Sequence, residues 1–314
     1  MDKNSLIYVA GHRGMVGSAI MRELKHLGFN RIITKTRLEL DLCNQAATED
    51  FFKNEKPEYV FFAAATVGGI LANMSEQARF LMENLQIQCN IIGNAYRYGT
   101  KKLLFLGSSC IYPKEAKQPI SESALLAGPL EPTNEGYAIA KIAGLKLCEY
   151  YNTQQGANFI SLMPCNLYGY NDNFDLQSSH FLPALIRKFY EAKHNNADII
   201  TVWGTGKVLR ELLFVDDLAK ACVFTMNNYS GPDFLNVGYG EDFTIAEYAQ
   251  MIKDISGFKG EIVYDMEKPD GMKRKIVDSS KIRALGWKPE VSLEEGIALT
   301  YNWYVDNVDK LSTK

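Results

Sequence analysis

The chain has 314 residues, of which 46% are hydrophobic, which is enough to bury one large core or two joined ones. Its net charge of −3 offers no general basic surface to nucleic acid, and no run of about 18 apolar residues is present to cross a membrane. Six cysteines without C-x-x-C spacing and only four histidines predict free thiols and no metal site, and without a signal-peptide pattern we expect a cytoplasmic protein.

Strands and helices alternate through the first half of the chain. An apolar, β-rich segment at 6–10 precedes a glycine turn and a segment at 18–27 whose apolar residues recur at helical spacing. The alternation continues with strands at 31–35, 59–63, 102–106 and 159–163 and helices at 45–53, 77–98 and 137–151. This pattern predicts an α/β fold with a Rossmann-type, doubly wound parallel sheet covered by helices on both faces.

The regular alternation ends after Pro164, which predicts a second, smaller lobe. Helices are expected at 183–193, 245–255 and 293–307, and a short strand at 199–203. The segment 212–225 has the pattern of a strand entering a helix, so we expect the chain to return to the first lobe near 212–230. The predicted domains are therefore 1–165, of the Rossmann type, and an interleaved α/β domain mainly over 166–314.

Closely spaced glycines follow the first predicted strand, in the order Gly11-x-x-Gly14-x-x-Gly17. Such glycines let phosphate oxygens approach the N–H groups at a helix N-terminus, where the macrodipole favours negative charge. The spacing differs from the commoner Gly-x-Gly-x-x-Gly, but its place between a strand and a helix predicts a dinucleotide site. A plain tight turn is the alternative.

Arg37 stands about twenty residues after this turn, where a site that prefers NAD usually has Asp or Glu. Arg13 lies inside the turn, and two guanidinium groups can form charge-assisted hydrogen bonds with a 2′-phosphate. We therefore predict a preference for NADP(H), with two solvated arginines as the alternative. The cofactor is expected to contact Gly11, His12, Arg13, Gly14, Met15, Val16 and Gly17, and then Arg37, Leu40, Asp41 and Leu42.

Polar residues follow the strand 102–106 at its carboxyl end, where ligands bind in open α/β sheets. Ser108 can hydrogen-bond a carbonyl group, although a serine there is often an ordinary cap. Tyr137 and Lys141 are spaced to project from one face of a helix. We expect the ammonium to lower the pKa of the phenol from about 10 and to favour proton exchange. A tyrosine packed beside a lysine stem is the alternative.

These residues and the glycine turn resemble the extended short-chain dehydrogenase/reductase family over most of the chain. Several further strings are similar to the GDP-L-fucose synthase branch of that family, namely 10–20, 67–70, 106–113, 131–134, 137–144, 166–169 and 268–271. The resemblance implies an NADPH enzyme that epimerises GDP-4-keto-6-deoxy-D-mannose at C3 and C5 and then reduces C4 to give GDP-L-fucose. It also implies a homodimer formed through the helices at 77–98 and 137–151.

The resemblance implies roles for individual residues. Cys110 and His180 match the pair that moves protons during epimerisation, Ser108 and Tyr137 would stabilise the enolate, and Tyr137 with Lys141 would serve the reduction. A buried apolar cysteine and a hydrogen-bonded loop histidine are the alternatives for that pair. The implied cofactor contacts also include Leu106, Gly107, Ser108, Ser109, Lys141, Pro164, Cys165, Asn166, Leu167 and His180, and the implied substrate contacts are Lys188, Trp203, Arg210 and Asp270.

The sequence departs from the family pattern at three places. Lys188 stands where many relatives have Arg, Cys165 where Thr is usual, and Met272-Lys273 where Thr-Pro is usual. Lysine keeps the charge of arginine but loses its bidentate fork, so a contact at 188 is expected to be weaker. The alternatives to the implied reaction are another nucleotide-sugar epimerase or dehydratase of this family and a non-catalytic NADP-binding sensor.

Overall fold

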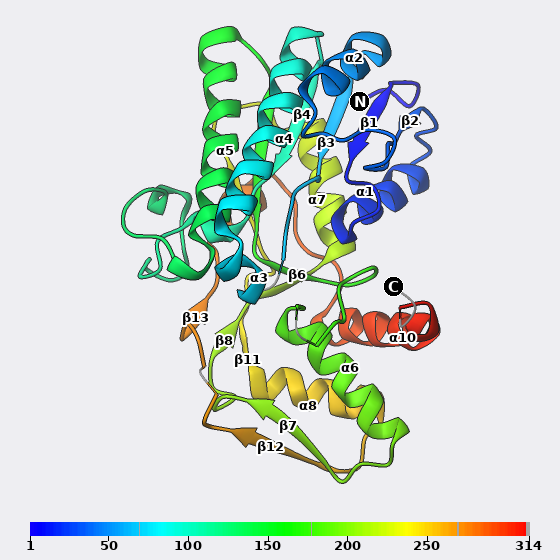
Figure 1. Ribbon diagram of the computed structural model, residues 1–314, viewed down its shortest axis with the longest axis vertical. Helices are drawn as coiled ribbons and strands as arrows, with labels where there is room; N and C mark the ends of the chain where they lie inside the picture. The colour runs from blue at the N-terminus through cyan, green and yellow to red at the C-terminus, as the bar shows by residue number, and fades with distance from the viewer. Residues whose placement is uncertain (69, 177, 269, 312–314) are drawn as a thin grey trace.

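A six-stranded sheet forms the centre of the larger lobe, which lies at the top of the computed structural model in Figure 1. The structure describes residues 1–68, 70–176, 178–268 and 270–311, so Gly69 and Pro269 of the family-like strings lie outside the described residues. All neighbouring strands run parallel, in the order β10-β5-β4-β3-β1-β2. The strands are β1 (Ile7–Ala10), β2 (Ile32–Ile33), β3 (Tyr59–Phe62), β4 (Lys102–Leu106), β5 (Phe159–Pro164) and β10 (Leu235–Val237).

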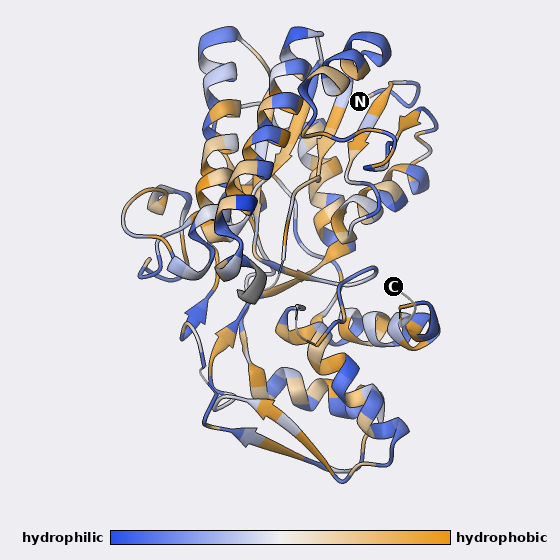
Figure 2. Ribbon diagram, viewed as in Figure 1, coloured by the Kyte–Doolittle hydropathy of each residue, from blue (hydrophilic) through white to orange (hydrophobic). Residues whose placement is uncertain are grey.

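Helices cover both faces of this sheet. The paired helices α4 (Gln77–Arg97) and α5 (Glu135–Gln155) lie on one face with α2 (Gln45–Glu55). On the opposite face α1 (Met15–His26) packs against α7 (Val215–Asn228). Because both faces are covered, the central strands are apolar on both sides, as the hydropathy colours of Figure 2 show. The predicted Rossmann-type α/β fold is confirmed.

The smaller lobe has its own core beneath the sheet. Helices α6 (Phe181–His194), α8 (Ile245–Ser256) and α10 (Leu293–Leu311) pack together around buried Phe189, Tyr248 and Ile297. The pair β7 (Ile199–Trp203) and β12 (Glu261–Asp265) is parallel, and a three-stranded sheet has the order β11-β8-β13. Its strands are β8 (Leu209–Arg210), β11 (Phe243–Thr244) and β13 (Arg274–Lys275).

Several late segments connect the two lobes. The strand β6 (Asn166–Tyr168) pairs in parallel with β9 (Leu212–Phe214), which leads directly into α7. After α7, β10 completes the large sheet and α9 (Ser280–Ala284) lies against it. The remaining helices are the short α3 (Ile70–Ser75) and the 3-10 turns η1 (Ser109–Ile111), η2 (Glu122–Ala124) and η3 (Pro132–Asn134). Over the described ranges, no helix has both the length and the apolar character needed to cross a membrane.

Candidate active site

The glycine turn lies between β1 and α1, at the carboxyl end of the sheet. Gly11 has a φ of +85°, and a Cβ atom there would lie 2.8 Å from the backbone nitrogen of Ala64. A Cβ atom on Gly17 would lie 2.1 Å from the carbonyl oxygen of Gly11. Gly14 is the N-cap of α1 and supplies no capping side chain, so the first N–H groups of the helix are left for another acceptor. This cradle fits the diphosphate of a dinucleotide.

The segment after β2 lies beside this turn. Hydrogen bonds from Thr36 lower the pKa of Glu39, and the charges of Lys35 and Arg13 act in the same direction, which places Arg13 near that segment. Arg13 and Arg37 are both exposed, and in the part of the chain that the structure describes neither forms an ion pair. Both guanidinium groups are therefore available to an external anion.

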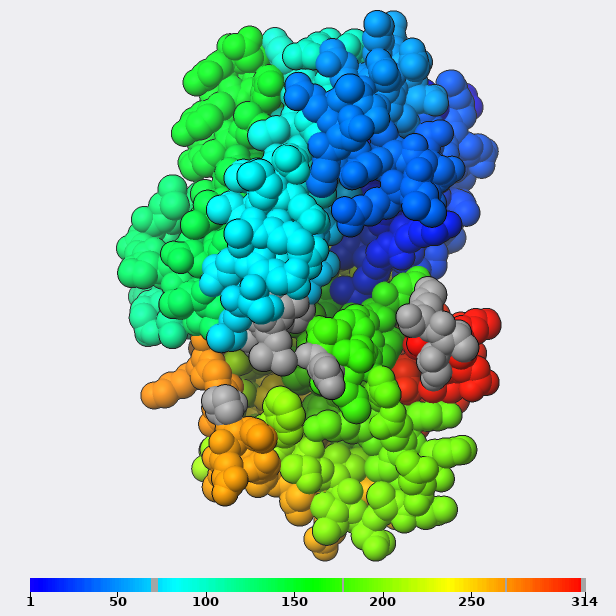
Figure 3. All heavy atoms as spheres, in the orientation of Figure 1, coloured from blue at the N-terminus to red at the C-terminus, as the bar shows by residue number. Residues whose placement is uncertain are grey.

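The other expected cofactor residues, apart from Lys141 and His180, lie at two places. Buried Leu40 is followed by exposed Asp41 and by Leu42, which lie in the segment between β2 and α2. The remaining group lies at the carboxyl ends of neighbouring strands β4 and β5, where the N–H of Gly107 donates to the carbonyl of Leu162 at 2.9 Å. That group consists of Leu106, the last residue of β4, with Gly107, Ser108 and Ser109 after it, and of Pro164, the last residue of β5, with Cys165, Asn166 and Leu167 after it. The two groups come from segments far apart in sequence, and Figure 3 shows a hollow between the lobes beside the dark-blue N-terminal segment.

Tyr137 and Lys141 lie on one face of α5, above the end of β4. The Lys141 ammonium donates to the carbonyl of Leu106 at 2.7 Å and lies 5.6 Å from the centroid of the Tyr137 ring. The expected depression of the phenol pKa is wrong, because burial raises the pKa of Tyr137 and the nearby Cys110 acts in the same direction. Burial also lowers the pKa of Lys141 to about 8, against a smaller upward effect of Cys110. Desolvation thus determines the direction of both pKa shifts.

Cys110 is the middle residue of the 3-10 turn η1, which begins directly after Ser108. The Ser108 hydroxyl accepts a hydrogen bond from the N–H of Cys110 at 3.3 Å, and the cysteine is buried. Burial raises the pKa of its thiol, whereas the charge of Lys275, the hydrogen bond from Ser108 and the charge of Lys141 lower it. Positive charge that favours the thiolate is therefore present, but burial has the larger effect.

His180 is the N-cap residue of α6 and enters the site from the smaller lobe. The residue keeps exposed surface. Desolvation lowers the pKa of the imidazole, and the charge of Lys275 acts in the same direction. Cys110 and His180 are thus both electrostatically linked to one lysine, so the structure brings them to a common region.

The four expected substrate residues gather at one end of the smaller lobe. Trp203 is 62% exposed, and the Lys188 ammonium lies 5.4 Å from the centroid of its indole while donating to the carbonyl of Thr201 at 3.1 Å. Asp270 accepts from the Thr205 N–H at 2.7 Å, which fixes the turn that follows Trp203. Arg210 is close enough to Asp270 for this carboxylate to raise its pKa, although burial lowers that pKa more. The cluster offers a flat ring and cations.

Two lysines of the site were missed by the sequence argument. The Lys268 ammonium lies 5.6 Å from the Trp203 centroid, on a residue that the sequence analysis used only as part of a string. Lys275 is linked to Cys110 and His180, as described above, and no motif or spacing indicated it. Among the described residues, no group of three or more His, Cys, Asp or Glu side chains is arranged to hold a metal ion.

Comparison with known proteins agrees with this geometry. Residues 7–238 match the model of the NAD dependent epimerase/dehydratase family. The chain belongs to this family. Within the NAD dependent epimerase/dehydratase family it is 58% identical to "GDP-L-fucose synthase 1" of Arabidopsis thaliana, over 98% of this chain and 95% of the relative. It is 50% identical to "GDP-L-fucose synthase" of Escherichia coli (strain K12), over 97% of this chain and 98% of the relative.

A solved structure of the same epimerase/dehydratase type has a closely similar fold. A "gdp-l-fucose synthetase" from Naegleria fowleri, crystallised "bound to NADP", superposes with a TM-score of 0.92 at 31% identity. The superposition covers 98% of this chain and 95% of that one. The resemblance to the extended short-chain dehydrogenase/reductases stated from the sequence is therefore confirmed.

The buried ammonium of Lys141 leads to a prediction about stability and activity together. Since its pKa is lowered from 10.5 to about 8, the Lys141 ammonium is charged at pH 7 in both states, and this charge is unfavourable only in the folded state, where burial removes it from water. We expect Lys141→Met to raise the free energy of unfolding by about 1 to 3 kcal/mol. This is a net value that includes the loss of the hydrogen bond to Leu106. Turnover should fall at least about 100-fold, because the group beside Tyr137 is lost.

Urea unfolding at several pH values checks the direction in which the free energy of unfolding changes with pH. Between pH 8 and 10.5 the unfolded chain binds more protons at Lys141, so wild-type stability should rise with pH relative to the variant. Lys146→Met is the matched control, because Lys146 lies on the same helix in a partly exposed ion pair with Glu149 at 2.8 Å. A Lys141→Met protein less stable than this control at pH 7 would contradict the analysis.

Proposed function

We propose that this chain is an NADPH-dependent 3,5-epimerase and 4-reductase that converts GDP-4-keto-6-deoxy-D-mannose to GDP-L-fucose. The observation that supports the proposal is that Ser108, Cys110, Tyr137 and Lys141 gather at the carboxyl end of β4, with the charge of Lys275 acting on both Cys110 and His180. The names of the relatives at 50% identity and above support the same reaction. The reaction of a simple 4-epimerase or a dehydratase does not need the pair Cys110 and His180. A non-catalytic NADP-binding sensor would not need Ser108, Tyr137 and Lys141.

The division of labour follows from the two lobes. We propose that the domain formed mainly by 1–165 binds NADP(H) and that the domain formed mainly by 166–314 binds the GDP-sugar. The glycine cradle, Arg13 and Arg37 would hold the cofactor, and its 2′-phosphate would lie near the two guanidinium groups. Lys188, Trp203, Arg210 and Asp270 would hold the nucleotide of the substrate, with the exposed indole as a surface for the base.

The epimerisations need groups on both faces of the sugar ring. The 4-keto group acidifies the C–H bonds at C3 and C5, so the thiolate of Cys110 can remove a proton and the imidazolium of His180 can return one to the opposite face. The hydroxyl groups of Ser108 and Tyr137 would donate hydrogen bonds to the enolate oxygen. For the reduction, Tyr137 gives its proton to the C4 oxygen, and Lys141 holds the end of β4 through Leu106. Bound NADPH supplies the hydride.

Purified protein with GDP-4-keto-6-deoxy-D-mannose and NADPH tests the proposal directly. The expected result is loss of the NADPH absorbance at one equivalent per product, and GDP-L-fucose as the product by NMR. A reduced product with the configuration at C3 and C5 of the starting sugar would show a reductase without epimerase activity and would overturn the proposal.

Cys110 is the residue to change in the same assay. We expect Cys110→Ser to reduce deuterium incorporation from solvent at C3 and C5 at least about 100-fold, because a hydroxyl is a much weaker base than a thiolate at this position. Cys89→Ser is the matched control, since Cys89 is an exposed cysteine on α4, away from the site. Unchanged exchange in Cys110→Ser would remove Cys110 from the role of base.

The preference for NADP(H) is tested at the two arginines. We expect Arg13→Ala and Arg37→Ala each to weaken NADPH binding about 10-fold or more, through loss of a charge-assisted contact with the 2′-phosphate, and to leave NADH binding nearly unchanged. Lys53→Ala, which removes an exposed charge on α2, should affect neither cofactor. Binding is read from the nicotinamide fluorescence. Equal losses for NADPH and NADH would contradict the assignment.

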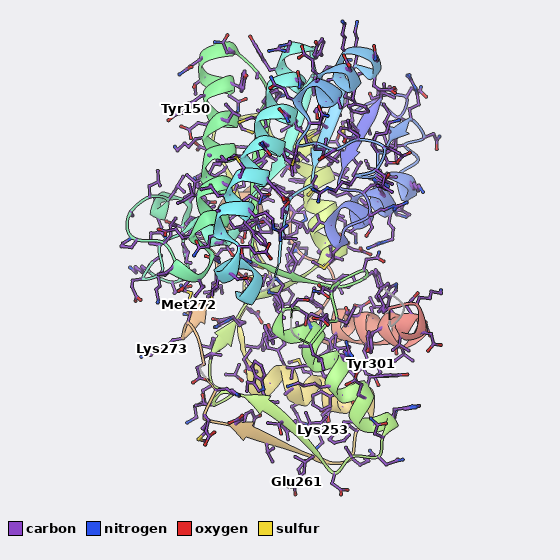
Figure 4. All side chains as sticks on the ribbon, in the orientation of Figure 1. Tyr150, Lys253, Glu261, Met272, Lys273 and Tyr301 are labelled. Atoms are coloured by element: carbon purple, nitrogen blue, oxygen red, sulfur yellow. The ribbon has the colours of Figure 1, made fainter. Side chains whose placement is uncertain are left out.

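We also propose a homodimer and a cytoplasmic location. The outer surface of α4 and α5 exposes large apolar side chains, including Met82 at 59%, Ile139 at 42% and Tyr150 at 50%, and Figure 4 shows Tyr150 pointing outward from α5. A second copy of these helices would cover that surface as a four-helix interface. A monomeric mass by light scattering at working concentration would reject the dimer. All six cysteines are free thiols, which supports a reducing compartment.

A further inference from the structure

Lys275 lies at the point where the smaller lobe meets the larger one. In the parallel pair β13 and β8, Lys275 is in register with Arg210, so the two side chains project from the same face of the small sheet. Arg274, the preceding residue, projects from the opposite face, where it forms a bidentate ion pair with Asp242. Alternation along the strand therefore sends Arg274 to a carboxylate and Lys275 toward the site.

The backbone around Lys275 is fixed from both lobes. Its carbonyl accepts from the N–H of Glu211 at 3.2 Å, in the smaller lobe. The next residue, Ile276, donates its N–H to the side chain of Gln118 at 2.9 Å and accepts from the N–H of Ile120 at 2.9 Å. The position of Lys275 is thus well determined. Its ammonium nevertheless has no ion-pair or hydrogen-bond partner anywhere in 1–68, 70–176, 178–268 or 270–311.

The groups that face this ammonium come from several elements. Burial lowers the pKa of Lys275, the thiols of Cys110 and Cys165 and the carboxylate of Glu131 raise it, and the guanidinium of Arg210 lowers it. In return, the charge of Lys275 lowers the pKa of the Cys110 thiol and that of the His180 imidazole. Lys141 also acts on Cys110, from the larger lobe. Glu131 already has a cationic partner, Lys114, at 3.4 Å.

We propose that Lys275 is a positioning residue for the epimerisation, whose unpaired ammonium stabilises the thiolate of Cys110 so that this buried sulfur can act as the base. The inference rests on the proposed function and adds a residue to it. In the step itself the thiolate takes the proton from carbon and becomes a thiol, and the electron pair of the C–H bond moves to the C4 oxygen. Because Lys275 comes from the smaller lobe and Cys110 from the larger one, the base is fully active only when the lobes are assembled.

The first measurement needs no substrate. The full chain is treated with iodoacetamide at a series of pH values, and alkylation of the peptide that contains Cys110 is followed by mass spectrometry. We expect Lys275→Met to move the midpoint for Cys110 upward by about one pH unit or more, since a cation near a buried thiolate is removed. Lys275→Arg should restore a midpoint near that of the wild type. Alkylation of Cys89, which lies on the helix α4 that the proposed dimer would use, should be the same in every protein.

Lys273→Met is the matched control. Lys273 lies two residues earlier on the same segment, is exposed, and is seen at the outer edge of the molecule beside β13 in Figure 4. This variant should keep the wild-type midpoint. If Lys275→Met does not fold, as judged by circular dichroism, Lys275→Gln removes the charge and keeps a polar side chain of similar reach.

Solvent deuterium exchange and GDP binding separate the role of Lys275 from a structural one. We expect Lys275→Met to lower exchange at C3 and C5 about 10-fold or more at pH 7, to recover part of it at higher pH, and to leave the Kd for GDP unchanged. If the pH midpoint of Cys110 alkylation is unchanged in Lys275→Met, the inference is overturned. If, in addition, GDP binds more weakly to this variant, the Lys275 ammonium contacts the diphosphate instead. A shifted midpoint in a protein that does not turn over the GDP-sugar would refute the proposed function but support the link between Lys275 and Cys110.

Discussion

Desolvation at the carboxyl ends of β4 and β5 is the constraint on which the chemistry of the site depends. It raises the pKa values of Tyr137 and Cys110 and lowers those of Lys141, His180 and Lys275, so it moves every reactive group toward its neutral form. Protein from both lobes contributes to this desolvation, because Tyr137, Cys110 and Lys141 belong to the larger lobe and His180 and Lys275 to the smaller one. A charged intermediate at this place must be stabilised by fixed groups of the protein.

Those fixed groups come from segments that are distant in sequence. Ser108 follows β4, Lys141 lies in α5, His180 begins α6 and Lys275 lies in β13. The late segments reach the site because the chain crosses between the lobes after β5 and because hydrogen bonds at Ile276 connect β13 to Ile120. The ammonium groups of Lys141 and Lys275 both act on Cys110, and they come from different lobes. The relative position of the two lobes therefore also determines how strongly positive charge stabilises the thiolate of Cys110.

The sequence predicted the regular elements well, because long amphipathic helices and apolar strands have a clear period. The segments 102–106 and 199–203 were expected as strands and are β4 and β7. The short strands β8, β10 and β13 were not expected, since two or three residues carry no readable period. Lys275 was missed for the same reason: in sequence it resembles any solvated lysine, and only its register with Arg210 places it in the site. The glycine cradle was predictable because its chemistry is local.

The expectation about Tyr137 was wrong in a way that clarifies its role. The i, i+4 spacing did bring Lys141 next to the Tyr137 ring, but burial raises the pKa of the phenol and keeps it protonated. A raised pKa makes Tyr137 a poor general base at neutral pH and a secure holder of its proton. The reduction requires a proton donor, and the alkoxide formed at C4 is a stronger base than a phenolate, so the transfer remains favourable. Burial therefore suits Tyr137 to donation, and leaves the removal of protons to Cys110, whose thiolate is the one that nearby cations support.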